Sequence, residues 1–127
     1  MKISEVSIRT QLSKDTIRYY EKLGLIRPQV IHHHRDYSES DIRRLNEIKL
    51  LKHASFSLKE VMYFISLDDK FQDIEAIYNM SDEDYSTLIS LIVRKQKEID
   101  DQINSLQIAK QSLTAMNTKL NSLGREQ

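Results

Sequence analysis

The segment RYY at residues 18–20 sets a guanidinium group beside two phenol groups, and these groups can bind the oxygen atoms of a phosphate. A surface helix buries only one of its faces. If Ile17 and Tyr20 pack inward, Arg18 and part of Tyr19 lie about 100° or more away and point outward. The chemistry offered to solvent therefore suits a polyanion. The alternative is that these side chains only cover a neighbouring helix.

The sequence around this segment predicts a helix-turn-helix. A short helix over about residues 4–11 is followed by Ser13, a good N-cap for a second helix that carries RYY. Gly24 should end this second helix, because glycine readily takes the left-handed conformation found after helix ends. The second helix of a helix-turn-helix can enter the major groove of DNA. Lys14 and Thr16 would then lie where such a helix approaches the base edges.

Charge is distributed unevenly along a chain whose formal net charge is zero. Residues 1–60 contain 12 Lys or Arg and 8 Asp or Glu, a net charge of +4, and they hold all 4 histidines. Residues 61–127 contain 7 and 11, a net charge of −4. The N-terminal half is therefore the candidate partner for a polyanion, with an ordinary solvated surface as the alternative.

The composition of the 127 residues indicates a mostly helical protein, because only 2 glycines and 1 proline are present. The sequence has no cysteine, so disulfides, thiolate metal sites and thiol sensing are not expected. No segment resembles a signal peptide or a membrane span, so we expect a cytoplasmic protein without a membrane partner. We expect neither a cofactor nor enzymatic activity, because there is no phosphate-cradling glycine loop and the acidic residues fall mainly on caps and exposed faces.

Residues 26–37, IRPQVIHHHRDY, are rich in β-formers and predict a small two-stranded wing. The histidines at 32–34 are metal ligands by type. Adjacent side chains in a strand point to opposite faces, so three consecutive histidines do not converge on one ion. We therefore expect no metal site, and a polar wing tip that becomes more cationic as the pH falls.

Two further helices should follow the wing. Ser38 is the expected cap of a helix that ends near Ala54. Ser57 and Glu60 form the capping box of the next helix, which we expect to stop around Leu67. The aromatic residues in and after that helix could wall a small-molecule effector pocket, with plain core packing as the alternative; they are Tyr63, Phe64, Phe71 and Tyr78.

The last third of the chain predicts one long helix. Ser81 and the three acidic residues after it are typical of a helix start, and neither glycine nor proline occurs from there to about Leu120. Apolar residues recur every seven positions, as in a coiled coil. They are Tyr85, Ile92, Ile99, Leu106, Leu113 and Leu120. A helix of roughly 39 residues extends about 58 Å, more than a small head can cover, so a second copy is the expected partner. The alternative is a helix that folds back on its own head.

These elements divide the chain into four parts. We predict a winged helix-turn-helix DNA-binding domain at 1–67, a connector that can hold a short helix at 68–80, a dimerisation helix at 81–121 and a tail at 122–127. The direction in which two such helices pair is left open by the sequence pattern.

Four short motifs occur in order along residues 2 to about 67: SKDTIRYYE, the helix exit GLI, the wing exit RDYSESD and FSL. Together they resemble the DNA-binding domain of the MerR family of transcription regulators. The resemblance implies that Ser13 caps the recognition helix and that further residues face DNA or hold the wing to its backbone. These are Lys14, Thr16, Arg18, Tyr19, Arg35 and Tyr37. The chain departs from the family pattern at three places: Gln11 and Ser55 stand where glycine is common, and His33-His34 where Gly-Tyr is common.

The resemblance also implies a fold and a mechanism. It implies that the long helix forms an antiparallel coiled coil in a homodimer that binds a pseudo-palindromic promoter site. Such dimers bend and untwist DNA so that RNA polymerase can use poorly spaced promoter elements, in response to an effector. The effector here would act without a thiol, since Leu50 stands where thiol-responsive relatives have cysteine. One alternative is an architectural or phage-type DNA-binding protein without an effector. Another is an interaction protein whose coiled coil does the binding.

Overall fold

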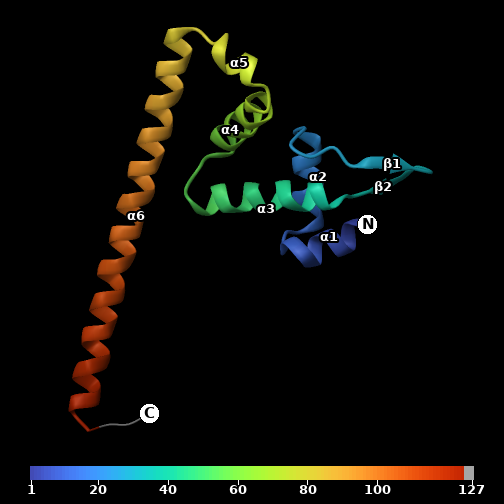
Figure 1. Cartoon of the computed structure of the whole chain (residues 1–127). Coiled ribbons are helices and arrows are strands. Elements are labelled where there is room, and N and C mark those ends of the chain that lie inside the picture. The colour runs from blue at the N-terminus through green and yellow to red at the C-terminus, as the bar shows by residue number, and fades with distance from the viewer. Residues whose placement is uncertain (125–127) are drawn as a thin grey trace. The chain divides into compact units, whose positions relative to one another are not determined.

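The computed structural model describes residues 1–124, except for the side chain of Phe71. It consists of two compact units, the head at Met1–Tyr78 and a second unit that begins at Asn79. The described part of the head contains five helices and one two-stranded sheet, and the second unit is a single long helix (Figure 1). No helix among the described residues is both long and apolar enough to cross a bilayer.

The helix-turn-helix is formed by α1 (Ile3–Thr10) and α2 (Lys14–Lys22). The side chain of Ser13 caps α2, because its Oγ accepts a hydrogen bond from the backbone N–H of Thr16 at 3.1 Å. Gly24 follows α2 with a φ of 79°, in the left-handed region. The predicted cap and the predicted helix stop are both confirmed.

The wing is a hairpin of β1 (Gln29–Ile31) and β2 (His34–Asp36), paired antiparallel with Ile31 opposite His34. Its loop has only two residues, His32 and His33, with φ values of 48° and 64°. Positive φ at both central residues is the geometry that matches the twist of a tight hairpin. The predicted two-stranded wing is confirmed.

Helices α3 (Glu39–His53) and α4 (Leu58–Phe71) both begin with capping boxes. In each, the Oγ of Ser38 or Ser57 accepts a backbone hydrogen bond at 3.1 Å from the third helical residue, whose carboxylate accepts one at 2.9 Å in return. The expected end of α4 near Leu67 is wrong. The four residues that extend the helix include neither glycine nor proline, and nothing in their chemistry stops a helix. The connector does hold a short helix, α5 (Ile74–Tyr78).

The core of the head is apolar. Its main cluster joins α1, α2, α3 and the exit of the wing, and consists of Val6, Ile17, Ile26, Tyr37, Ile42 and Leu45. Ile48 of α3 and Val61 of α4 are also fully buried. The predicted inward row of α3, at Ile42, Leu45 and Ile48, is therefore confirmed.

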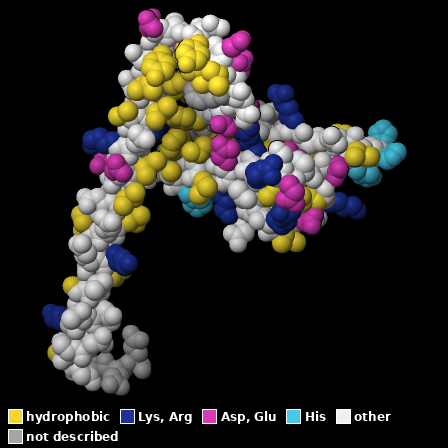
Figure 2. Space-filling view, in the orientation of Figure 1, with side chains coloured by type: hydrophobic (Ala, Val, Ile, Leu, Met, Phe, Trp, Pro, Cys, Tyr) yellow, Lys and Arg dark blue, Asp and Glu magenta, His cyan; other side chains and the backbone are white. Residues whose placement is uncertain are grey.

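The second unit is helix α6 (Asp82–Ser122), capped by Ser81, whose Oγ accepts the N–H of Asp84 at 3.1 Å. The predicted long helix is confirmed, and it extends one residue further than expected. Large apolar side chains along it are exposed in the single chain (Figure 2). They include Tyr85, Ile89, Val93, Ile103, Leu106, Leu113, Met116 and Leu120. Of the predicted tail at 122–127, residues 125–127 lie outside the described part of the chain.

Left-handed backbone occurs at four non-glycine residues of the described chain: Gln11, His32, His33 and Ser55. Gln11, His33 and Ser55 are the same positions at which the MerR-like pattern commonly has glycine. L-amino acids pay roughly 1–2 kcal/mol for this conformation. The three turns therefore keep a glycine-type shape without glycine.

Replacing His33 by glycine is expected to stabilise the head by about 0.5–1 kcal/mol. Glycine removes the cost of the positive φ, and the greater entropy of the unfolded chain offsets part of the gain. The His33 side chain is exposed, so little packing is lost. Urea unfolding of the two proteins measures the difference.

The matched control is His53→Gly, an exposed histidine in the last turn of α3. Glycine there lowers helix propensity, so this variant should be destabilised by up to about 1 kcal/mol. Equal destabilisation by both substitutions would show that the positive φ at His33 does not cost free energy that glycine can remove.

Candidate nucleic-acid interface

Helix α2 presents one buried face and one exposed face. Ile17 is fully buried, and Tyr20 is half-buried beside the core cluster, where burial raises the pKa of its hydroxyl. Tyr19 is exposed, and its ring meets that of Tyr20 edge to face with centroids 6.3 Å apart. The prediction that one tyrosine packs while the other stays available is confirmed.

The polar side chains of α2 that were predicted to face DNA lie at the surface. Arg18 is exposed and its Nη1 lies 3.3 Å from Oδ1 of Asp15, a loose pair within the helix. Lys14 is exposed as well. Thr16 is half-buried, and its Oγ1 accepts a hydrogen bond from the Ser13 hydroxyl at 2.8 Å. Lys14 and Arg18 lie one turn apart on the same side of α2, and Thr16 lies on the opposite side near the start of the helix.

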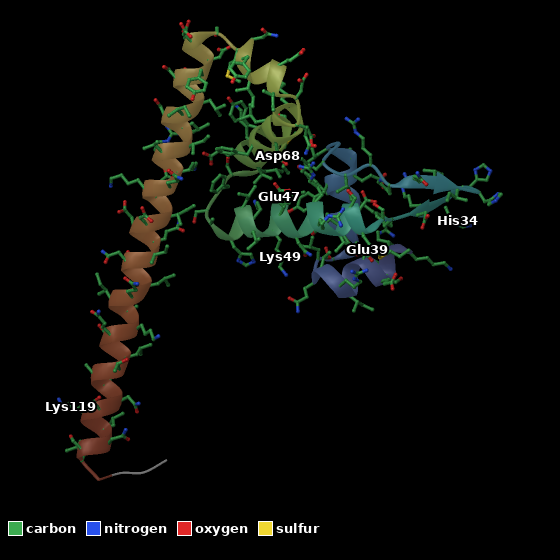
Figure 3. The ribbon with its side chains drawn as sticks, in the orientation of Figure 1. His34, Glu39, Glu47, Lys49, Asp68 and Lys119 are labelled. Atoms are coloured by element: carbon green, nitrogen blue, oxygen red, sulfur yellow. The ribbon has the colours of Figure 1, made fainter. Side chains whose placement is uncertain are left out.

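A cavity of about 670 Å³ lies between Arg18 and Glu21 of α2, the N-terminal residues and the wing. Its lining is mainly basic and polar, and consists of Lys2, Ile3, Ser4, Arg18, Glu21, His33, His34, Arg35 and Tyr37. Figure 3 shows His34 on the outlying part of the wing. The structure thus brings the predicted Arg18 and Arg35 to the walls of one cavity, although they are far apart in sequence.

Arg35 joins the wing to α2. Its Nε donates to both carboxylate oxygens of Glu21, at 2.9 and 3.0 Å. These hydrogen bonds, with the negative charge of Glu21, raise the pKa of Arg35 above its ordinary value. The cation is thereby held at the side of α2.

Tyr37, which the resemblance assigns to holding the wing to the DNA backbone, lies mostly in the core of the head. Only 2% of its surface is exposed, and its ring belongs to the core cluster of the head. Its hydroxyl is buried without a hydrogen-bond partner among the described residues, and burial raises its pKa. In this structure Tyr37 anchors the wing exit in the core, and its contact with the DNA backbone stays a prediction.

Of the residues predicted to wall an effector pocket, Tyr63 and Phe64 are in contact with each other. Phe64 packs edge to face against Phe56 and Tyr63, with ring centroids 5.3 and 6.0 Å apart. Tyr63 and Tyr78 are exposed, and the side chain of Phe71 lies outside the described part. The contacts of Phe64 agree with core packing, and an effector site here stays a prediction.

Sequence reasoning missed Glu21, which was noted only as part of a motif. The signal available in the sequence was the negative charge of Glu21, because the rest of this segment was interpreted as a cationic surface. Its partner Arg35 is 14 residues away, and no local pattern reports such a contact. Among the described residues, no group of three or more His, Asp or Glu side chains is placed to hold a metal ion.

Comparison with known families gives a match over the first half of the chain. The model of the MerR HTH family regulatory proteins matches residues 1–66. The transcriptional regulator HmrR of Rhizobium leguminosarum bv. viciae is 32% identical over 107 residues, which cover 84% of this chain and 75% of HmrR. YfmP of Bacillus subtilis is 31% identical over 137 residues, covering 94% and 91%. A probable heavy metal-dependent regulator of Haemophilus influenzae is 41% identical, but over 54% of this chain and 56% of its own length.

Solved structures share the fold. HiNmlR, a MerR family regulator that lacks the sensor domain and is bound to promoter DNA, superposes with a TM-score of 0.65 at 22% identity. The superposition covers 98% of this chain and 90% of HiNmlR. PbrR691 of Ralstonia metallidurans CH34, in complex with lead(II), gives a TM-score of 0.53 at 21% identity, covering 98% and 86%.

Proposed function

The chain belongs to the MerR family of helix-turn-helix transcriptional regulators, and on this premise we propose that it binds a pseudo-palindromic promoter site as a homodimer. Each head would place α2 in a major groove and set its wing against the DNA backbone. The observation that carries this proposal is the cavity between α2 and the wing, with Arg18 and Arg35 both in its lining. Guanidinium groups placed in this way suit phosphate oxygens.

The homodimer is supported by the exposed apolar side chains of α6. They include Tyr85, Leu106, Leu113 and Leu120, which fall on the seven-residue spacing of a coiled-coil seam. A second copy of α6 would cover these apolar side chains with apolar side chains of its own. We propose that Tyr85, Ile92, Ile99, Leu106 and Leu113 contribute to this seam, with the heads at residues 1–67 held apart by it.

Charge along α6 favours an antiparallel pair. Residues 82–101 contain 3 Lys or Arg and 6 Asp or Glu, a net charge of −3. Residues 102–122 contain 2 Lys and no acidic residue, a net charge of +2. An antiparallel arrangement sets the acidic half of one helix against the basic half of the other, whereas a parallel one sets like charge beside like.

Regulation would follow from the shape of the dimer. Two heads at a fixed separation can hold DNA bent and untwisted, and contacts to the DNA offset the deformation cost of a few kcal/mol. An effector that favours one dimer shape would shift promoter use by RNA polymerase. Because the sequence has no cysteine, the effector would be held without thiolate ligands.

A second candidate is a DNA-binding protein of the same fold without an effector. The similarity to HiNmlR, described as lacking the sensor domain, supports it. A screen of promoter activity against metal ions and small molecules separates the two. A protein that keeps its DNA binding but never changes promoter output would favour the second candidate.

Replacing Arg18 by alanine is expected to weaken DNA binding by about 1–3 kcal/mol and to reduce the dependence of affinity on salt concentration. The reason is the loss of a phosphate contact that releases counterions. The DNA that copurifies with the protein can be sequenced to supply the duplex, and titration at several salt concentrations then gives both quantities.

Arg94→Ala is the matched control. Both arginines pair with an acidic residue on their own helix, and their side chains are exposed to 59% and 63%. Arg94 lies on α6, outside the head, so its loss should leave affinity unchanged. If Arg18→Ala bound the duplex as tightly as Arg94→Ala did, α2 would not be the recognition helix.

A further inference from the structure

An acidic side chain lies in the surface that the proposed function assigns to DNA. Glu21 lines the same cavity as Lys2, Arg18 and Arg35. A carboxylate near phosphate groups repels them, so by charge alone Glu21 should weaken DNA binding. A favourable contribution to DNA binding is therefore needed to offset the repulsion between the Glu21 carboxylate and the phosphates.

The geometry of the Glu21–Arg35 contact supplies one. Both carboxylate oxygens of Glu21 accept from the same atom, Nε of Arg35, at 2.9 and 3.0 Å. The Glu21 carboxylate therefore binds the Arg35 guanidinium only through Nε. The two outer nitrogens, Nη1 and Nη2, have no hydrogen-bond or ion-pair partner among the described residues. They are also the pair that makes a forked contact with a phosphate.

The contact also links two elements that must act together. Arg35 lies in β2 opposite Val30, and Glu21 lies in the last turn of α2. Half of the Arg35 side chain is exposed, whereas that of Glu21 is only 22% exposed. The more buried partner therefore holds the more exposed one, and fixes the wing cation relative to the recognition helix.

We infer that Glu21 is a positioning residue, which holds Arg35 by its Nε so that Nη1 and Nη2 are ready for one DNA phosphate. This inference rests on the proposed function. A free arginine side chain loses rotamer freedom when it binds, and an arginine already fixed by Glu21 loses less. The gain from this ordering exceeds the repulsion between Glu21 and the phosphate.

The sign of the effect makes the inference testable. If Glu21 only repels DNA, Glu21→Gln should tighten binding, because the substitution removes a charge and keeps the shape. If Glu21 positions Arg35, Glu21→Gln should weaken binding, by about 3- to 10-fold for each head. Glu47→Gln is the matched control in the head, since the side chain of Glu47 is 44% exposed and its arginine partner, Arg44, is not assigned to DNA. Its affinity should stay unchanged or rise.

A double-mutant cycle on the full-length protein then isolates the pair. Affinity for the copurified duplex is measured for Glu21→Gln, Arg35→Ala and the double variant. We expect Glu21→Gln to weaken binding in the wild-type background, and to have no effect or to strengthen binding once Arg35 is alanine. Tighter binding by Glu21→Gln alone, or equal weakening in both backgrounds, would overturn the inference.

A measurement without DNA keeps the test independent of folding defects and of the proposed function. The Nε–H signal of Arg35 in an NMR spectrum should exchange slowly with water in the wild-type protein, and faster in Glu21→Gln. An unchanged exchange rate in a folded variant would contradict the positioning role. If Arg18→Ala and Arg35→Ala both leave DNA binding intact, the proposed function fails. If both weaken binding and Glu21→Gln does not, only this inference fails.

Discussion

Replacing Leu106 and Leu113 together by glutamate is expected to convert the protein from a dimer into a monomer that no longer holds its promoter site. In the single chain these side chains are exposed to 70% and 66%, so they contribute little to the folding of α6 alone. A dimer buries four of them, each contributing about 1.5–3 kcal/mol. The total of about 6–12 kcal/mol corresponds to a rise in the dimer dissociation constant of at least about 10⁴-fold. Sedimentation equilibrium measures this change.

The double substitution Asn104→Glu and Gln111→Glu adds the same charge to nearby turns of α6, on the side of the helix away from the seam. This control should remain dimeric and bind DNA. A dimer that survives Leu106→Glu with Leu113→Glu would mean that the seam is wrongly assigned. Dissociation of both double variants would mean that total charge, and not the apolar stripe, decides assembly.

Replacing Leu45 by alanine should lower the free energy of unfolding of the head by about 2–5 kcal/mol. Leu45 is fully buried at the centre of the apolar cluster, where truncation removes apolar burial and leaves a cavity. A head of this size has a total stability of only about 5–15 kcal/mol. The loss is thus a large fraction, and urea unfolding followed by circular dichroism measures it.

Leu50→Ala is the matched control on the same helix. Leu50 is 71% exposed, so its truncation should change the free energy of unfolding by less than about 0.5 kcal/mol. Comparable losses at the two positions would place Leu50 in an interface that the single chain does not show.

Local chemistry made most of the fold predictable. Ser13, Ser57 and Ser81 each satisfy backbone N–H groups at a helix start, and such caps act over three residues, within the reach of sequence reasoning. The apolar row of α3 and the heptads of α6 follow from helical periodicity in the same way. The end of α4 was misjudged, because a helix without a stop residue ends where packing ends.

Contacts between distant segments were less predictable. The burial of Tyr37 and the pairing of Glu21 with Arg35 depend on how α2, α3 and the wing meet, and not on the residues beside them. The motif only marked this region of the chain. It did not separate the side chain that faces the cavity from the one that supports it.

The left-handed turns at Gln11, His33 and Ser55 bear on how this chain can change over generations. All three residues are exposed, and exposed sites usually accept most substitutions. At these three turns the positive φ restricts which substitutions are tolerated, because glycine and asparagine adopt it readily whereas valine and isoleucine do not. These turns are surface positions that natural variation should explore only narrowly.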